Sequence, residues 1–209
     1  MLFRRISKKS DSPKDAIAKS QKLIIITGCA GSGKTTIGKA LAKRLHYVYI
    51  DKDTVTREFT DYILESQGAS KYSRESELYR KKVMHLEYNT TFKLCRELLE
   101  TGSDVIVTIP FQYYITDYHK WLDFREKSNI PSTVDVKFVW IEHRESVEKV
   151  NLTRRNADRD QYKLKNWDEY AHSIDGIKPC SDYNAYKYVN DCNVQLDVAL
   201  NDLAEWIIK

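Results

Sequence analysis

One segment near the start of the chain has the residue types of a phosphate-binding loop. Residues 28–35 read Gly-Cys-Ala-Gly-Ser-Gly-Lys-Thr and match the pattern GxxxxGK[ST]. Glycines let successive backbone N–H groups point at phosphate oxygens, and Lys34 supplies a cation for the β- and γ-phosphates. The Thr35 hydroxyl is a Mg²⁺ ligand of the usual kind. The residues that we expect to contact the nucleotide are Gly28, Cys29, Ala30, Gly31, Ser32, Gly33, Lys34, Thr35 and Thr36.

Two carboxylates follow the next short apolar segment, residues 47–50. In parallel α/β sheets ligands bind at the carboxyl ends of the strands, where Asp51 and Asp53 are expected. If the chain is still extended there, positions two apart project to the same side. One carboxylate then holds Mg²⁺ together with Thr35, a role that we give to Asp51, while the other accepts a hydroxyl proton. Which of the two is the base stays open, and the alternative for Asp53 is a helix cap.

These motifs together resemble the small P-loop kinases that phosphorylate hydroxyl groups. GCAGSGKTT, then YIDKD, then a late arginine-containing segment are similar to shikimate and gluconate kinases, chloramphenicol phosphotransferase, zeta toxins and polynucleotide kinases. DKDT, RESELY and WDEY also resemble segments of kinase-type AAA family ATPases. The resemblance implies ATP and Mg²⁺ as cofactors and puts the paired carboxylates on Asp51 and Asp53. It also compares Arg57 with an arginine that sometimes follows the catalytic aspartate.

The third apolar segment departs from this resemblance. Many such kinases carry an acidic residue in or just after the third strand, whereas this chain has Thr108 followed by Ile109 and Pro110. A threonine cannot supply a carboxylate. Metal binding is therefore expected to depend on Thr35 and the aspartate pair.

A charged segment late in the chain, residues 151–167, is predicted to form a lid. It contains Arg154, Arg155 and Arg159. Arginines on a mobile loop over the phosphates would neutralise transition-state charge and exclude water, and by resemblance to lid segments we assign this role to Arg155 and Arg159. An ordinary solvated loop is the alternative.

The acceptor pocket is harder to predict than the phosphate site. Two histidines, His85 and His119, lack the spacing of metal ligands. Aromatic residues near the carboxyl edge of the sheet could stack on a planar substrate or only complete the core. The residues to inspect are Arg74, Glu87 and Tyr88 on a long predicted helix, Phe111 and Tyr114 after the third strand, and Trp167.

The elements that must position these residues alternate between strand and helix. Strands are expected at 23–27, 47–50, 105–109, 134–141 and 186–189. Helices are expected at 35–45, 51–66, 73–100 (as one helix or two), 116–128, 145–156, 168–174 and 196–207. This order predicts an α/β fold of the P-loop NTPase type: a three-layer sandwich with a five-stranded parallel sheet, helices on both faces and a helical lid insertion. Residues 22–209 are expected to form one domain after a polar lead-in, residues 1–21.

Composition narrows the class of protein. The chain of 209 residues is 42% hydrophobic and 31% charged, which is typical of a globular protein, and it has no apolar run long enough to span a membrane. Its lead-in lacks a secretory signal, and serves as a basic anchor or a frayed terminus. The cysteines are too widely spaced for a CxxC metal site: Cys29, Cys95, Cys180 and Cys192. Reduced thiols in the cytoplasm are the expectation, with Cys29 either a loop-filling residue or a thiol of lowered pKa.

Three functions follow from the sequence. The leading hypothesis is ATP-dependent phosphoryl transfer to a hydroxyl of a metabolite, nucleoside or antibiotic, with Lys34 and Mg²⁺ neutralising charge. The second acceptor is the 5′-hydroxyl of a nucleic acid, suggested by Arg57, Lys71, Arg74 and the basic residues 80–82, although a net charge of +4 does not favour it. The third is a nucleotide-regulated ATPase or binding protein. ATP versus GTP and the oligomeric state stay open.

Overall fold

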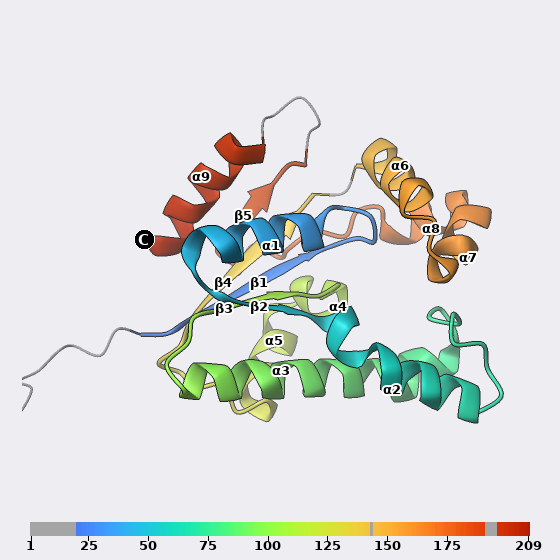
Figure 1. Ribbon diagram of the computed structural model, residues 1–209, viewed down its shortest axis with the longest axis horizontal. Helices are drawn as coiled ribbons and strands as arrows, with labels where there is room; N and C mark the ends of the chain where they lie inside the picture. Colours follow the sequence, from blue (N-terminus) through green and yellow to red (C-terminus); the bar gives the residue numbers. More distant parts are fainter. Residues whose placement is uncertain (1–19, 143, 191–195) are drawn as a thin grey trace, which may run out of the picture.

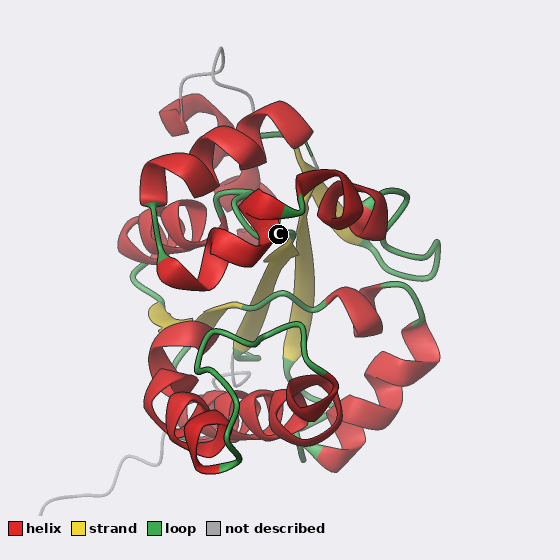
Figure 2. Cartoon of the chain, turned by 90° about the vertical axis from the view of Figure 1, so that its right-hand side faces the viewer, coloured by secondary structure: helices red, strands yellow, loops and turns green. Residues whose placement is uncertain are grey.

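The computed structural model describes residues 20–142, 144–190 and 196–209. A five-stranded sheet with strand order β2-β3-β1-β4-β5 forms its centre, and every pair of neighbouring strands is parallel. The strands are β1 (Lys22–Gly28), β2 (Val48–Asp51), β3 (Val105–Thr108), β4 (Asp135–Ile141) and β5 (Ala185–Tyr188). In Figure 2 these strands lie between two layers of helices.

The central strand β1 explains why the sheet needs helices on both faces. All seven of its residues are buried, and its run of aliphatic side chains suits a strand without a solvent-facing side. Because side chains alternate along a strand, Leu23 and Ile25 belong to one core cluster while Ile24 and Ile26 belong to the other. One short segment therefore holds both helical layers against the sheet.

The two helical layers come from different parts of the chain. α1 (Lys34–Leu45) and α9 (Leu196–Ile208) pack on the face of Ile24 and Ile26, whereas α3 (Met84–Glu100) and α5 (Tyr118–Lys127) cover the opposite face (Figure 1). The predicted α/β fold with a three-layer arrangement is confirmed. The division into a lead-in and one domain stays a prediction, and residues 1–19 of that lead-in lie outside the described residues.

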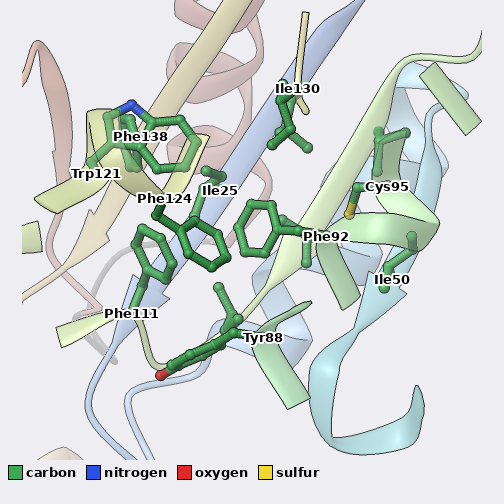
Figure 3. Close-up of a cluster of buried hydrophobic side chains, with 14 of the residues drawn as sticks. Ile25, Ile50, Tyr88, Phe92, Cys95, Phe111, Trp121, Phe124, Ile130 and Phe138 are labelled. Carbon is green, nitrogen blue, oxygen red and sulfur yellow. The ribbon is translucent and has the colours of Figure 1, made fainter. Parts of the chain in front are cut away.

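Aromatic side chains fill the core between α3, α5 and the sheet (Figure 3). The Phe92 and Phe124 rings meet edge to face with centroids 4.8 Å apart, and Phe111 stacks on Tyr114 at 4.5 Å. Phe111 is completely buried. Phe111 and Tyr114 therefore complete the core, the second of the two roles considered for them.

The remaining helices surround the carboxyl ends of the strands. They are α2 (Lys52–Ser66), the π-helical turn η1 (Tyr79–Val83), α4 (Gln112–Ile115), α6 (Glu145–Arg155), the 3₁₀ turn η2 (Asp158–Asp160), α7 (Gln161–Lys165) and α8 (Trp167–Ile174). The predicted helix over 73–100 starts later than expected: residues 73–76 are not helical, and helical structure begins at Glu77, directly before η1. Arg74 therefore lies before the helix and not on it.

In the ranges 20–142, 144–190 and 196–209, no helix is long and apolar enough to cross a membrane. The cysteines there, Cys29, Cys95 and Cys180, are all free thiols. Cys192 lies outside the described residues.

Candidate active site

The loop between β1 and α1 requires glycine at several positions. Gly28, Gly31 and Gly33 have positive φ angles of 149°, 83° and 99°. A Cβ atom on Gly31 would lie 2.9 Å from the carbonyl oxygen of Glu148, so even alanine would collide with backbone. Backbone with this curvature can point N–H groups into one concavity, which is what an anion needs.

Lys34 lies across this loop. Its Nζ donates to the carbonyl oxygens of Gly28 at 2.8 Å and Cys29 at 2.6 Å. Burial lowers the pKa of Lys34 to about 8. A phosphate would replace part of the lost hydration and favour the charged form.

Cys29 is not an activated thiol. Burial raises its pKa to about 12, with a further contribution from the charge of Glu148, although Gln112 donates a hydrogen bond to its sulfur at 3.3 Å. Burial outweighs the two effects that lower this pKa, the charge of Lys34 and the hydrogen bond from Gln112, so Cys29 is the loop-filling residue of the two alternatives.

Three side chains from the second half of the chain hold the loop from outside. Asn151 Nδ2 donates to the Gly31 carbonyl oxygen at 2.8 Å, and Asn190 Nδ2 donates to the Ser32 carbonyl oxygen at 2.8 Å. Tyr170 Oη accepts from the Ala30 N–H at 3.2 Å. None of these three residues was predicted from the sequence. Tyr170 at least belongs to the WDEY segment, whereas the asparagines carry no signal of their own.

Asp51 lies beside the Thr35 hydroxyl. Its Oδ2 accepts from Thr35 Oγ1 at 3.0 Å, from Tyr49 Oη at 3.1 Å and from Thr108 Oγ1 at 3.1 Å. Thr108 pairs in register with Asp51 on the neighbouring strand. The threonine that stands where many similar kinases carry an acidic residue therefore helps to hold the Asp51 carboxylate in place. Oδ1 of Asp51 also accepts from the Thr54 N–H at 3.2 Å and caps α2.

Asp53 has a different environment. The chain becomes helical directly after Asp51, so the premise of an extended segment was wrong, and the residue that caps the helix is Asp51. Lys52 Nζ lies 2.9 Å from Asp53 Oδ1, and Arg159 Nη1 lies 2.8 Å from Oδ2. Burial alone would raise the pKa of Asp53, but its cationic neighbours outweigh burial and hold the pKa well below its usual range.

The predicted lid has two further short helices, η2 and α7, where we expected arginines on a mobile loop. α6 continues to Arg155, and η2 and α7 follow almost at once. Arg155 binds Asp160 through Nε at 2.8 Å and Nη2 at 2.6 Å, while Arg159 reaches Asp53. Arg155 therefore joins two parts of the lid to each other, and Arg159 joins the lid to α2.

A cleft of about 1480 Å³ joins these residues at the carboxyl edge of the sheet. Asp51, Asp53, Arg155 and Arg159 all line it. Gly28, Cys29 and Ser32 belong to the loop but do not line the cleft. The other predicted nucleotide contacts do line it: Ala30, Gly31, Gly33, Lys34, Thr35 and Thr36.

The predicted acceptor residues separate into two groups. Arg74 and Tyr88 line the cleft, as does Arg57, whose guanidinium group has no hydrogen bond or ion pair to any described residue. Trp167 is buried, and its indole donates to Glu145 Oε1 at 2.7 Å. Trp167 therefore supports the lid and is not a pocket residue. Glu87 lies beneath the cleft surface, fully buried.

The donor set suits Mg²⁺ better than a transition metal. No cluster of three or more histidine, cysteine, aspartate or glutamate side chains occurs among the described residues, and His85 and His119 are exposed. Thr35 and Asp51 offer a hydroxyl and a carboxylate next to the loop. Mg²⁺ takes few protein ligands and keeps waters and phosphate oxygens, so these residues fit it.

Comparison with known proteins agrees with this geometry. Over 90 residues, 41% of this chain and 48% of the relative, the chain is 41% identical to shikimate kinase of Caldicellulosiruptor bescii. It thus spans about half the length of the shikimate kinases that it matches first.

Solved structures match over most of the chain. A putative kinase from Chloroflexus aurantiacus has a TM-score of 0.63 at 17% identity, covering 91% of this chain and 98% of that one. A sugar kinase from Janibacter sp. has a TM-score of 0.58 at 14% identity, covering 90% and 95%. At these identities the likeness concerns the fold alone. The model of the AAA domain family matches residues 23–177, and the chain therefore belongs to that family, with the fold of the small P-loop kinases.

Proposed function

We propose that the protein transfers the γ-phosphate of ATP to a hydroxyl group of a small molecule. The observation that carries the proposal is the position of Asp53: its carboxylate lines the same cleft as Lys34 and lies against a lid arginine. A phosphate loop and a carboxylate across one cleft are what alcohol phosphorylation requires, since the loop binds the donor and the carboxylate orients the acceptor. Similarity to shikimate kinase over part of the chain supports the same class of reaction.

The nucleotide end of the cleft would bind the donor. Lys34 would turn from the loop carbonyls to the β- and γ-phosphates, and the loop N–H groups would bind phosphate oxygens. Thr35 and Asp51 would hold Mg²⁺ at this end. When bound, the ion neutralises part of the phosphate charge.

Asp53 would orient the acceptor hydroxyl. Since its pKa is held low, the carboxylate is ionised at neutral pH and can accept a hydrogen bond from that hydroxyl. As the acceptor oxygen bonds to the γ-phosphorus, the bond from that phosphorus to the bridging oxygen breaks, ADP leaves, and Asp53 takes the hydroxyl proton. Asp51 is less suited to this step, because its Oδ2 already accepts from three hydroxyl groups.

The lid would supply positive charge and exclude water. Arg155 is anchored on the buried carboxylate of Asp160, which fixes its place near the phosphates. Arg159 bridges to Asp53 and would stabilise charge between donor and acceptor. A cytoplasmic location, expected from the cysteine pattern, is part of the same proposal.

The nucleic-acid alternative receives less support. Arg74, one of the cations that suggested it, is already paired with Glu87 and Asp61. Paired charges release few counterions on binding a phosphate backbone. A small acceptor is therefore the better proposal.

The test is a phosphorylation screen of metabolites, nucleosides and antibiotics with labelled ATP. We expect label transfer to at least one hydroxyl compound, and a loss of about 10²- to 10⁴-fold in turnover for Asp53→Asn with ATP affinity retained. Asp168→Asn, at an exposed position on α8, is the matched control. If Asp53→Asn turns over a confirmed acceptor at the normal rate, the proposal fails. ATP hydrolysis that no compound redirects favours the nucleotide-regulated alternative.

A further inference from the structure

Glu87 is a fully buried carboxylate beneath the acceptor end of the cleft. Its Oε2 accepts from Lys52 Nζ at 2.6 Å and from Tyr79 Oη at 2.7 Å. Its Oε1 accepts from Thr60 Oγ1 at 2.7 Å and from Arg74 Nη1 at 2.8 Å. A buried charge is costly unless it is paired and hydrogen-bonded, and Glu87 has two cations and two hydroxyls around it.

One of these cations connects Glu87 to Asp53. Lys52 is only 3% exposed, and its Nζ lies 2.6 Å from Glu87 Oε2 and 2.9 Å from Asp53 Oδ1. The ammonium group is thus held between a buried carboxylate and a cleft carboxylate. Since Glu87 is fixed by three other donors, it defines where Lys52 lies and hence where Asp53 is held.

The other cation connects Glu87 to the segment that walls the cleft. Arg74 Nη2 lies 2.6 Å from Asp61 Oδ1 on α2, while Nη1 binds Glu87 on α3. Tyr79 is the first residue of the π-helical turn η1. π-helical turns are frequent at functional sites, and both Arg74 and Tyr79 line the cleft. Glu87 therefore fixes the non-helical segment 73–76 and the start of η1 as well as Asp53.

We propose that Glu87 is a positioning residue for phosphoryl transfer. Acting through Lys52, it holds Asp53 in the orientation that receives the acceptor hydroxyl, and acting through Arg74 and Tyr79, it fixes the wall against which the acceptor lies. This inference rests on the proposed function, because it concerns the carboxylate to which that proposal gives the acceptor. Glu87 itself does not touch the substrate.

The glutamine variant separates positioning from nucleotide binding. Glu87→Gln keeps the side-chain shape, but its amide nitrogen cannot accept from Lys52 or Tyr79. A misplacement of about 1 Å can cost about 10²-fold in rate, so we expect kcat to fall about 10- to 100-fold. The KM for ATP should stay within about twofold, because none of the contacts of Glu87 reach residues 28–36.

Two further variants complete the experiment. Glu97→Gln changes an exposed carboxylate on the same helix and should leave kcat unchanged. Glu87→Asp, which retains the charge, should recover part of the lost kcat. If Glu87→Gln does not fold, Tyr79→Phe removes a single hydrogen bond to Glu87 and should lower kcat severalfold at unchanged KM for ATP.

A double variant tests whether Glu87 acts through Asp53. If it does, adding Glu87→Gln to Asp53→Asn costs less than the full loss of the single Glu87→Gln variant, because only the contribution through Arg74 and Tyr79 is left to lose. Full additivity of the two losses would overturn the proposal, as would a normal kcat for Glu87→Gln or an equal loss of kcat and ATP binding. If Asp53→Asn loses turnover but Glu87→Gln does not, the positioning role of Glu87 is wrong and the proposed function stands. Normal turnover in Asp53→Asn removes the proposed function.

Discussion

The two ends of the cleft are built in different ways. The nucleotide end is one continuous segment, residues 28–36, shaped by glycines with positive φ and followed by a helix. The acceptor end is made by side chains that meet across long sequence distances: Arg159 and Asp53 are 106 positions apart, and Lys52 and Glu87 are 35 apart. The first end is encoded locally in backbone conformation, whereas the second exists only after the chain has folded.

This difference predicts different weak points. At the nucleotide end, changes of backbone, volume or the single loop cation should be most damaging. At the acceptor end, changes of charge should dominate, since ion pairs join α2 to α3, Arg74 to α3, and the lid to α2.

The largest effect expected at the nucleotide end is that of changing Lys34. Removing the loop cation in Lys34→Ala leaves the phosphate charge without its side-chain partner, and turnover of ATP should fall about 10³-fold. The measurement is initial rate with labelled ATP, together with calorimetric titration of ATP. Lys39→Ala, on an exposed position of the same helix, should behave normally. Loss of less than tenfold in Lys34→Ala would mean that the loop backbone alone binds the phosphates.

A smaller loss is expected when the link between lid and α2 is removed. Arg159→Ala leaves the Asp53 carboxylate with an ion pair to Lys52 alone. We expect kcat to fall about 10- to 100-fold. This loss is smaller than the loss on removing an arginine that binds the transferred phosphate directly. Steady-state kinetics at saturating ATP give the value. Lys165→Ala, an exposed position on α7, is the control. Equal rates for the two variants would remove Arg159 from the site.

The free energy of unfolding should be sensitive to the tight packing around Gly38, behind the nucleotide end of the cleft. Alanine at Gly38 would place its Cβ 2.5 Å from Thr108 Cγ2 and 2.7 Å from Tyr49 Cε2. Overpacking of this kind costs about 1–3 kcal/mol of unfolding free energy, partly offset by the better helix propensity of alanine. Urea denaturation of Gly38→Ala, with Lys39→Ala as the matched variant on α1, measures it. An unchanged midpoint would show that this contact can relax freely.

The smallest effect concerns thiol reactivity and its pH dependence. Burial raises the pKa of both Cys29 and Cys95 to about 12. Only the thiolate reacts, so at pH 8 about one thiol in 10⁴ is reactive, and the fraction rises tenfold per pH unit toward 12. Iodoacetamide at pH 8, followed by peptide mass spectrometry, should label the partly exposed Cys180 before either of them. Rapid labelling of Cys29 would contradict its role as a loop filler.

The fold was largely predictable from the sequence because its signals are local. Buried aliphatic runs gave β1 and β3, and the stripe of Leu200, Leu203 and Ile207 gave α9. In the lid, the helix at 145–156 was predicted, but the short helices η2 and α7 were not, since the charged residues after α6 carry no clear helix signal. Composition alone does not separate a charged loop from a charged helix.

The candidate site was predictable only in part. The sequence indicated Asp53 and Arg159 separately, but their ion pair depends on how the lid folds onto α2. Lys52 was visible between the two aspartates, yet its partner Glu87 comes from α3, and no spacing rule joins them. Asn190 binds a loop carbonyl 158 positions away. Such contacts are set by the packing of whole elements, which a single sequence does not reveal.

The orientation of the acceptor wall depends on the number of residues in the π-helical turn at Tyr79–Val83. A π-turn holds one residue more than an α-turn, so deleting one residue from 80–82 would convert it to regular helix. Every residue before the deletion would then rotate by about 100° around the helix axis. Tyr79 would leave Glu87, and the segment that carries Arg74 would turn with it. Homologous chains that lack one residue here should therefore present a different acceptor wall, even with every residue named above retained.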